Sequence, residues 1–279
     1  MRTNHFTANI NGINVFYEFH HDSHSSGLSK PTLVMIHGFL SSSFSFRRLI
    51  PLLTKDYTVL AIDLPPFGKS EKSKKFVYSY ENLARVVIAL LDKLSIKRTV
   101  LIGHSMGGQI ALNVSNQKPE LVEKVVLLCS SGYLKRLPAR IVYSSKIPYF
   151  YLYLKFWLAR QGPLKNLLNV VYDHSLIDDE MIEGYTQPFY DDQIFHALTR
   201  MIRDREGDLA SDILKKIETP SLLIWGEDDK VVPLEIGKRL NKDLPNSHLI
   251  TYKKTGHLLP EEKPQDVTEN ILDFIQTSY

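Results

Sequence analysis

Apolar residues recur along the chain in short, unbroken runs that have the length of strands. From residue 32 onward these runs are continuous instead of alternating, a pattern typical of parallel strands that are buried on both faces. Residues 79–96 carry an apolar stripe at helical spacing between two such runs. The expected strands are residues 13–19, 32–38, 57–63, 99–105, 124–130, 221–226 and 247–253, with one more before residue 9.

Strands that alternate with helices predict the fold class. The pattern indicates an α/β protein with a mostly parallel, eight-stranded sheet and helices on both faces. The first two strands are separated only by the sequence "NING", so we expect them to form an antiparallel hairpin at one edge of the sheet.

The regular spacing of strands breaks once, where some 90 residues separate the run at 124–130 from the run at 221–226. One crossover helix does not need that length. We therefore expect an inserted helical cap over residues 133–212, and a core made of residues 1–132 and 213–279. The cap segment 147–158 is rich in aromatic residues. We expect at least half of the cap's apolar side chains to pack in the cap's own core.

Charge and composition exclude several classes of protein. The chain has 279 residues, with 34 basic and 31 acidic ones, so its net charge of +3 does not favour a nucleic-acid partner. Its one cysteine, Cys129, excludes an internal disulfide. The sequence shows neither the apolar core of a signal peptide nor a run of about 18 apolar residues, so a cytoplasmic location is expected.

A polar segment over residues 20–31 contains His20, His21, Asp22 and His24. These side chains include possible metal ligands. The segment is also a polar loop with four serines, which favours a solvated turn over a metal site.

The sequence "TVLIGHSMGGQIALNVS" over residues 99–115 places Gly103, Ser105 and Gly107 in a G-x-S-x-G pattern between a strand and a helix. In that context the pattern predicts a sharp, strained turn that holds the serine hydroxyl at the carboxyl end of the sheet. The two glycines remove Cβ atoms that would clash. Ser105 is therefore the candidate nucleophile.

A serine nucleophile needs a base, and the base needs an acid that orients it. His257 follows the last expected strand in a loop that contains a glycine, which makes it the candidate base. His104 is expected to point away from the serine, and His37 to hold its own loop by hydrogen bonds.

Three adjacent acids, Glu227, Asp228 and Asp229, follow the strand at 221–226. A calcium loop would alternate its ligands and carry a later glutamate, and this run does neither. One of these acids should therefore accept the Nδ1 proton of His257.

Five motifs occur in an order that resembles the α/β-hydrolase superfamily over roughly residues 30–275. They are "HGF", "DLPPFGKS", "GHSMGG", "WGEDDKVVP" and "GHLLPEEKP". The resemblance implies a triad of serine, aspartate and histidine, with no cofactor and no metal.

The resemblance also implies individual roles. The family's aspartate lies four residues before the proline that opens the next helix, and counting back from Pro233 selects Asp229, with Asp228 second. The backbone N–H groups of Phe39 and Met106 would form an oxyanion hole, supported by the turn at His37 and Gly38.

Differences between this chain and some branches of the family reduce the number of expected activities. Haloalkane dehalogenases and epoxide hydrolases of this fold use an aspartate nucleophile, so Ser105 disfavours both. Carbon–carbon hydrolases commonly have asparagine before the serine and tryptophan after the histidine, where this chain has His104 and Leu258.

The expected activity is hydrolysis of a carboxylic ester of a small to medium, fairly apolar molecule. Three alternatives stay open: a small-molecule sensor with slow turnover and a protein partner, a carbon–carbon hydrolase, and a perhydrolase or acyltransferase.

Residues 133–165 contain seven basic and no acidic residues, which is compatible with a membrane surface, but a solvated basic face is favoured.

Overall fold

The computed structural model describes residues 2–21 and 30–277. Its centre is an eight-stranded sheet with the order β1-β2-β4-β3-β5-β6-β7-β8. The pairs β1–β2 and β2–β4 are antiparallel and the other neighbouring pairs are parallel. The strands are β1 Arg2–Ile10, β2 Ile13–His21, β3 Thr32–Ile36, β4 Val59–Ile62, β5 Thr99–His104, β6 Val122–Leu128, β7 Ser221–Gly226 and β8 Ser247–Tyr252.

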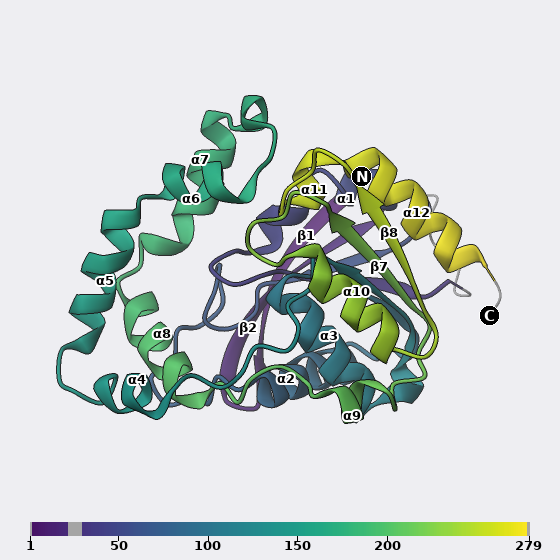
Figure 1. Cartoon of the computed structure of the whole chain (residues 1–279). Helices are drawn as coiled ribbons and strands as arrows, with labels where there is room; N and C mark the ends of the chain where they lie inside the picture. The colour runs from purple at the N-terminus through teal and green to yellow at the C-terminus, as the bar shows by residue number, and fades with distance from the viewer. Residues whose placement is uncertain (1, 22–29, 278–279) are drawn as a thin grey trace.

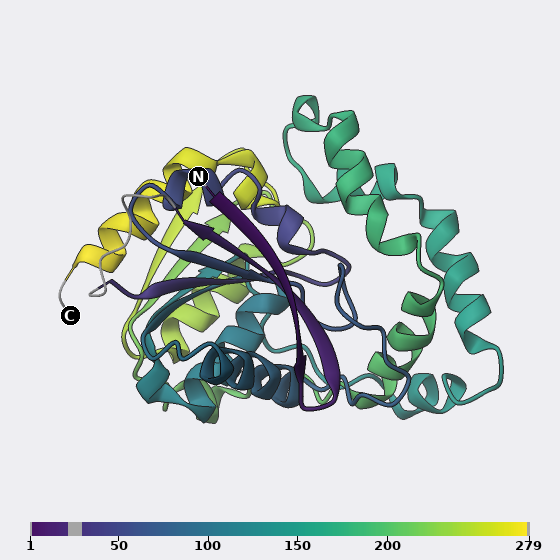
Figure 2. The same ribbon diagram turned by 180° about the vertical axis from the view of Figure 1, so that it is seen from behind.

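Helices cover both faces of the sheet. Figures 1 and 2 show α2, α3 and α10 on one face and α1, α11 and α12 on the other. The core helices are α1 Ile50–Leu53, α2 Tyr80–Lys93, α3 Met106–Gln117, α9 Ser211–Leu214, α10 Leu234–Asp243, α11 Leu259–Glu262 and α12 Pro264–Gln276, with 3-10 helices η1 Ser43–Phe46 and η2 Pro119–Leu121.

The continuous apolar runs form the middle of this sandwich. Every residue of β4 and β5 is buried, as is every residue of β7, because helices cover these strands on both sides. Helix α2 begins where the Ser79 side chain accepts a hydrogen bond from the N–H of Asn82, and its apolar stripe faces the core. The predicted fold class is confirmed.

A group of helices between β6 and β7 forms the cap. Figures 1 and 2 show it standing beside one end of the sheet. Its elements are α4 Ala139–Ser144, α5 Phe150–Gln161, α6 Pro163–Val170, η3 His174–Leu176, α7 Asp179–Thr186, η4 Gln187–Phe189 and α8 Gln193–Asp204. An isolated bridge between Lys135 and Gly207 brings the two ends of this insertion together. The exact extent, residues 133–212, stays a prediction.

The expectation that at least half of the cap's aromatic and leucine side chains pack in the cap's own core fails for segment 147–158. Many of the apolar side chains of segment 147–158 do not pack in the cap's own core. Large parts of six of them are exposed: Ile147, Tyr149, Leu152, Tyr153, Phe156 and Trp157. Helix α5 carries apolar residues around its whole circumference, and the cap is too thin to bury more than one side of it.

The expected solvated turn at residues 20–31 is also partly wrong. Strand β2 continues through His20 and His21, and His20 is buried. Its ring contacts Thr3 Oγ1 at 3.0 Å and Glu18 Oε2 at 3.1 Å. Pairing with β1 extends the strand beyond its apolar run. The positions of Asp22 and His24 lie outside the described residues.

Candidate active site

Ser105 occupies a tight turn between β5 and α3. Its backbone has φ 53° and ψ −120°, a conformation that non-glycine residues rarely adopt. The Ser105 N–H donates to the carbonyl of Leu128, and the Ser105 carbonyl accepts from the N–H groups of Gly108 and Ser131. A backbone conformation of this kind costs about 1–3 kcal/mol of folding free energy, and these hydrogen bonds hold Ser105 in it.

Glycines make this turn possible because other backbone segments pass very close. A Cβ on Gly107 would lie 2.0 Å from the carbonyl oxygen of Ile36, at the end of β3. A Cβ on Gly103 would lie 2.5 Å from the carbonyl oxygen of Gly107. Both partners are backbone atoms that cannot rotate away, so residues with side chains do not fit here.

His257 and Asp229 meet in the loops after β8 and β7. His257 Nδ1 lies 2.7 Å from Asp229 Oδ2, and both side chains are almost fully buried. The other oxygen, Asp229 Oδ1, accepts from the N–H groups of Val231 at 2.7 Å and Val232 at 2.9 Å. The carboxylate is therefore held in one orientation by three donors.

The surroundings of Asp229 keep it ionised. Burial acts to raise the pKa of its carboxyl group, but the hydrogen bond from His257, the charge of that ring and the two backbone N–H groups together lower the pKa. A permanent carboxylate at Nδ1 fixes the His257 tautomer whose Nε2 is free of a proton and can act as a base.

The two neighbouring acids have different surroundings. Glu227 and Asp228 are exposed. Glu227 accepts a hydrogen bond from Thr251, and Asp228 Oδ2 accepts the N–H of Lys254 at 2.9 Å. Both therefore hold the β7 and β8 loops together, and Asp229 alone of the three contacts His257.

Ser105 and His257 line the same cavity, of about 550 Å³. Within the described part of the chain, no hydrogen bond involves Ser105 Oγ. Catalytic hydrogen bonds are often loose before substrate binds, so this geometry is compatible with a nucleophile and its base. The roles of Ser105, Asp229 and His257 stay predictions.

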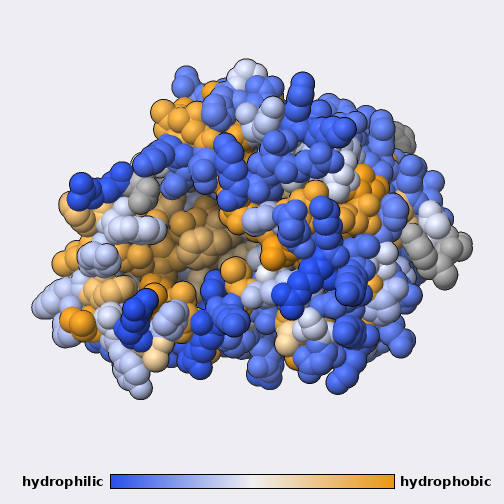
Figure 3. All heavy atoms as spheres, viewed as in Figure 1, coloured by the Kyte–Doolittle hydropathy of each residue, from blue (hydrophilic) through white to orange (hydrophobic). Residues whose placement is uncertain are grey.

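A second cavity, of about 430 Å³, meets the first at Ser105. The two share Phe39, Trp157, Leu158 and Val231, and both have mainly apolar walls that combine core loops with cap helices. Figure 3 shows this hollow as hydrophobic surface between the cap and the core.

The loop after β3 lies against the serine turn. A Cβ on Gly38 would lie 3.1 Å from Ser105 Cβ. The His37 ring is buried: its Nδ1 donates to the Gly38 carbonyl at 2.7 Å, and its Nε2 accepts the N–H of Leu64 at 2.9 Å. His37 therefore ties this loop to the loop after β4, as expected.

Phe39 and Met106 reach the wall of the cavity that holds Ser105, and their role as oxyanion donors stays a prediction.

His104 points away from the serine side chain and supports His257 from behind. His104 Nε2 donates to the His257 carbonyl at 2.8 Å, and the two rings lie 4.9 Å apart. Its Nδ1 is buried with no hydrogen-bond partner. Burial, followed by the nearby His257 ring, lowers the pKa of His104 to about 3. His104 is thus a neutral spacer that helps to position the candidate base.

The cap also supports the His257 loop through contacts that no sequence pattern predicts. The His257 N–H donates to the carbonyl of Val170, the last residue of α6, at 2.7 Å. Leu258 packs in a small cluster with Leu167, Val171 and Met181 of the cap. These residues are far apart in sequence, so their apolar character was the only sign of this contact in the sequence.

Cys129, Asp229 and His257 place potential metal-binding atoms within 4.8 Å of one another. Asp229 and His257 are already bonded to each other. Burial raises the pKa of the Cys129 thiol well above its usual range, so the thiolate that a metal needs does not form readily. The donor set therefore fits a metal poorly.

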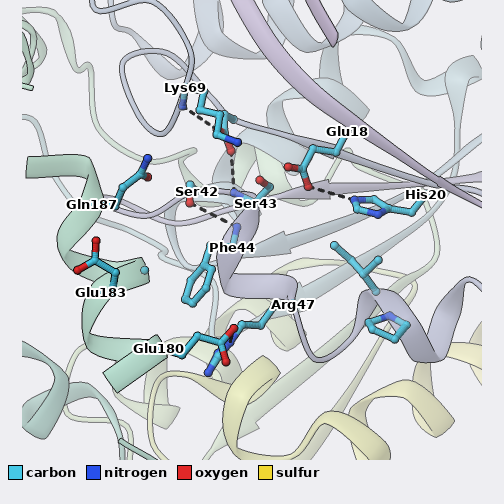
Figure 4. Close-up of a pocket in the computed structure, with 14 residues that line it drawn as sticks. Glu18, His20, Ser42, Ser43, Phe44, Arg47, Lys69, Glu180, Glu183 and Gln187 are labelled. Atoms are coloured by element: carbon cyan, nitrogen blue, oxygen red, sulfur yellow. Dashed lines mark hydrogen bonds and ion pairs between the residues drawn. The ribbon is translucent and has the colours of Figure 1, made fainter. Parts of the chain in front are cut away.

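A further cavity of about 490 Å³ lies between η1 and α7 and does not include Ser105. Figure 4 shows Glu18 paired with His20 and Ser42 paired with Phe44, whereas the Glu183 and Gln187 side chains have no partner among the residues drawn. Asp63 accepts from the N–H groups of Ser43 at 2.7 Å and Lys69 at 2.8 Å. A Cβ on Gly68 would lie 2.1 Å from Asp63 Oδ2, which explains the glycine in "DLPPFGKS". These hydrogen bonds of Asp63 hold the loops after β3 and β4 together.

The fold and the arrangement of serine turn, histidine loop and acid loop define a hydrolase class, and the sequence comparisons agree. Residues 31–264 match the family described as "alpha/beta hydrolase fold", and the chain belongs to that family.

The chain is 59% identical to "Uncharacterized hydrolase YugF" of Bacillus subtilis (strain 168) over 267 residues, which cover 96% of each chain. It is 30% identical over 271 residues to a protein of Paraburkholderia phymatum, covering 90% of this chain and 88% of the relative. That relative is named "2-hydroxy-6-oxononadienedioate/2-hydroxy-6-oxononatrienedioate hydrolase".

The structure of a serine hydrolase involved in carbazole degradation (CarC enzyme) superimposes with a TM-score of 0.79. The two chains are 24% identical, and the match covers 98% of this chain and 99% of the other.

His104 provides a prediction on pH dependence. In the unfolded chain His104 has its usual pKa of 6.5, whereas in the folded chain its pKa is about 3. Between these two pH values the unfolded chain therefore binds a proton at His104 that the folded chain does not bind. Folded stability should therefore fall as pH decreases through this window, by about 1.4 kcal/mol per pH unit from this group. His104→Gln should remove this contribution, as measured by urea unfolding from pH 7 to 4, whereas exposed His248→Gln should keep the wild-type slope. Parallel curves for wild type and His104→Gln would contradict this account.

Proposed function

We propose that the protein is a serine hydrolase that cleaves a carboxylic ester of a small to medium, fairly apolar molecule through an acyl-serine intermediate. The observation that carries the proposal is the buried Asp229–His257 hydrogen bond of 2.7 Å beside the cavity that contains Ser105. An aspartate bonded to Nδ1 is what a histidine needs in order to take a proton from a serine hydroxyl at Nε2.

The residues suggest the following sequence of steps. His257 Nε2 takes the Ser105 proton while Oγ attacks the acyl carbonyl. The N–H groups of Phe39 and Met106 stabilise the oxyanion, and Asp229 stabilises the imidazolium. The imidazolium then protonates the leaving alcohol, and the neutral ring activates a water molecule that releases the acid.

The shape of the site supports an ester with two apolar parts. The cavities of about 430 and 550 Å³ meet at Ser105 and, beyond their shared wall, have different lining residues, so one can hold the acyl part and the other the alcohol part. The shared wall of Phe39, Trp157 and Val231 separates the two parts at the reacting carbon.

One observation favours a second candidate, hydrolysis of a 2-hydroxy-6-oxo dienoic acid. A relative that is 30% identical is named "2-hydroxy-6-oxononadienedioate/2-hydroxy-6-oxononatrienedioate hydrolase". His104 and Leu258, where such enzymes commonly have asparagine and tryptophan, favour the ester. The sensor, perhydrolase and acyltransferase alternatives share the triad, and slow ester turnover combined with a tight protein partner would favour the sensor.

The first test is turnover of short- and medium-chain p-nitrophenyl esters and of a 2-hydroxy-6-oxo dienoic acid. Wild type should hydrolyse the esters with higher kcat/KM. Ser105→Ala should lower kcat at least a thousandfold because the nucleophile is lost. Ser144→Ala, an exposed serine of α4, should change nothing. Preference for the dienoic acid, or full ester turnover by Ser105→Ala, would refute the proposal.

The second test distinguishes the neighbouring acids. Asp229→Asn keeps the size of the side chain but favours the wrong His257 tautomer, so kcat should fall roughly ten-thousandfold. Asp228→Asn is the matched control and should stay within about threefold of wild type, since Asp228 contacts only the loop at Lys254. Equal losses in both variants, or a larger loss at Asp228, would contradict the assignment.

A further inference from the structure

Helix α5 is apolar on all sides, and only one side is covered. Leu154 and Leu158 face inward and line the cavity beside Ser105, and the Tyr151 ring stacks on His196 of α8 at 3.8 Å. A helix that is apolar all round is normally buried all round. Figures 1 and 2 both show α5 at the outer edge of the molecule, where no described element covers its other side.

The uncovered side of α5 forms a continuous stripe. Leu152, Tyr153 and Phe156 follow one another at the spacing of a single helix face, and Tyr149 is the residue that precedes the helix. All four are exposed, with Tyr149 at 72% and Phe156 at 60%. Exposed apolar residues are ordinary when they are scattered, but these four and exposed Ile147 occur within ten consecutive residues, which indicates a surface that contacts something.

A basic cavity of about 340 Å³ opens beside this stripe, with Tyr149 in its wall. Its basic side chains come from three segments of the chain, and no acidic residue lines it within the described residues. They are Lys74, Lys146, His196, Arg200 and Arg203.

Most of the charge in this cavity is not neutralised. Arg200 pairs with Asp204 at 2.9 Å. Arg203 donates to the side chain and carbonyl of Ser145, which are neutral acceptors. Among the described residues, Lys74 and Lys146 have no carboxylate within ion-pair distance. A cluster of this kind attracts a phosphate group.

The combination of an aromatic stripe and a basic cavity indicates which kind of partner contacts this surface. In a two-fold contact both copies present this same aromatic and basic patch, so a second copy would cover the stripe without supplying an anion for the basic cavity. An anionic phospholipid surface satisfies both features, because it offers phosphate groups at the level of the cavity and an apolar layer just below them. No described helix is both long and apolar enough to cross a membrane, so the contact would be peripheral.

We propose that the outer face of α5 and the adjacent basic cavity form a docking surface for anionic phospholipid membranes. Tyr149, Tyr153 and Phe156 enter the border between head groups and acyl chains, and Lys74 and Lys146 hold a lipid phosphate. The inner face of the same helix forms a wall of the cavity at Ser105, so docking brings that cavity close to the lipid surface.

The test is flotation of the whole protein with vesicles of phosphatidylcholine, either alone or mixed with phosphatidylglycerol. Wild type should float with the mixed vesicles and far less with the neutral ones. Lys74→Gln/Lys146→Gln should lower the partition coefficient roughly thirtyfold, as two charges at an anionic surface imply. Tyr153→Ser/Phe156→Ser should lower it at least about tenfold.

Matched controls separate docking from general charge and from folding. Lys97→Gln/Lys242→Gln removes two exposed lysines from the core and should keep wild-type partitioning within about threefold. None of these residues lines the cavities at Ser105, so turnover of a soluble ester, measured without vesicles, should remain unchanged in all three double variants. That measurement keeps failure of docking distinct from failure of the proposed ester hydrolysis.

Several results would overturn the docking surface. They are equal flotation with both vesicle types, wild-type flotation of the aromatic variant, or equal losses in the control and the Lys74/Lys146 variant. Sedimentation of wild type as a dimer that Tyr153→Ser/Phe156→Ser dissociates would assign the stripe to a second copy. Binding of glycerol 3-phosphate in solution without any flotation would assign the basic cavity to a free phosphate compound.

Discussion

The close approach of two backbone turns is the constraint on which the site depends. The turn at Ser105 follows β5, and the loop at His37 and Gly38 follows the neighbouring strand β3. Gly107 passes so near the end of β3 that a Cβ would lie 2.0 Å from a carbonyl oxygen. This packing fixes the backbone of Ser105 in one place, and the loops after β7 and β8 then need only bring Asp229 and His257 to the same edge of the sheet.

The cap completes the site instead of merely covering it. The Val170 carbonyl accepts the His257 N–H, and the cluster around Leu258 joins α6 and α7 to the histidine loop. Helix α5 forms part of both cavity walls at Ser105 with its inner face, while its outer face is exposed. Movements of the cap would therefore affect both the shape of the substrate cavity and the position of the candidate base.

The sequence predicted the parallel sheet well because buried strands leave continuous apolar runs, and it located the serine turn because glycines are required there. It could not show that β2 continues through His20, since that extension depends on pairing with β1. It also misplaced the aromatic side chains of the cap. An all-round apolar helix looks the same in sequence whether one side or both sides are buried, and the answer depends on how many neighbouring helices surround it. Likewise, the contact between His257 and Val170 joins residues 87 positions apart, and no local pattern encodes it.

The central claim is that Ser105 is a nucleophile activated by His257, and covalent labelling tests it most directly. The protein would be treated with a fluorophosphonate and its peptides analysed by mass spectrometry. One label should appear on Ser105, and His257→Gln should slow labelling at least about a hundredfold because the base is lost. Failure of Ser105 to react, a label on another residue, or equally fast labelling of His257→Gln would contradict the account.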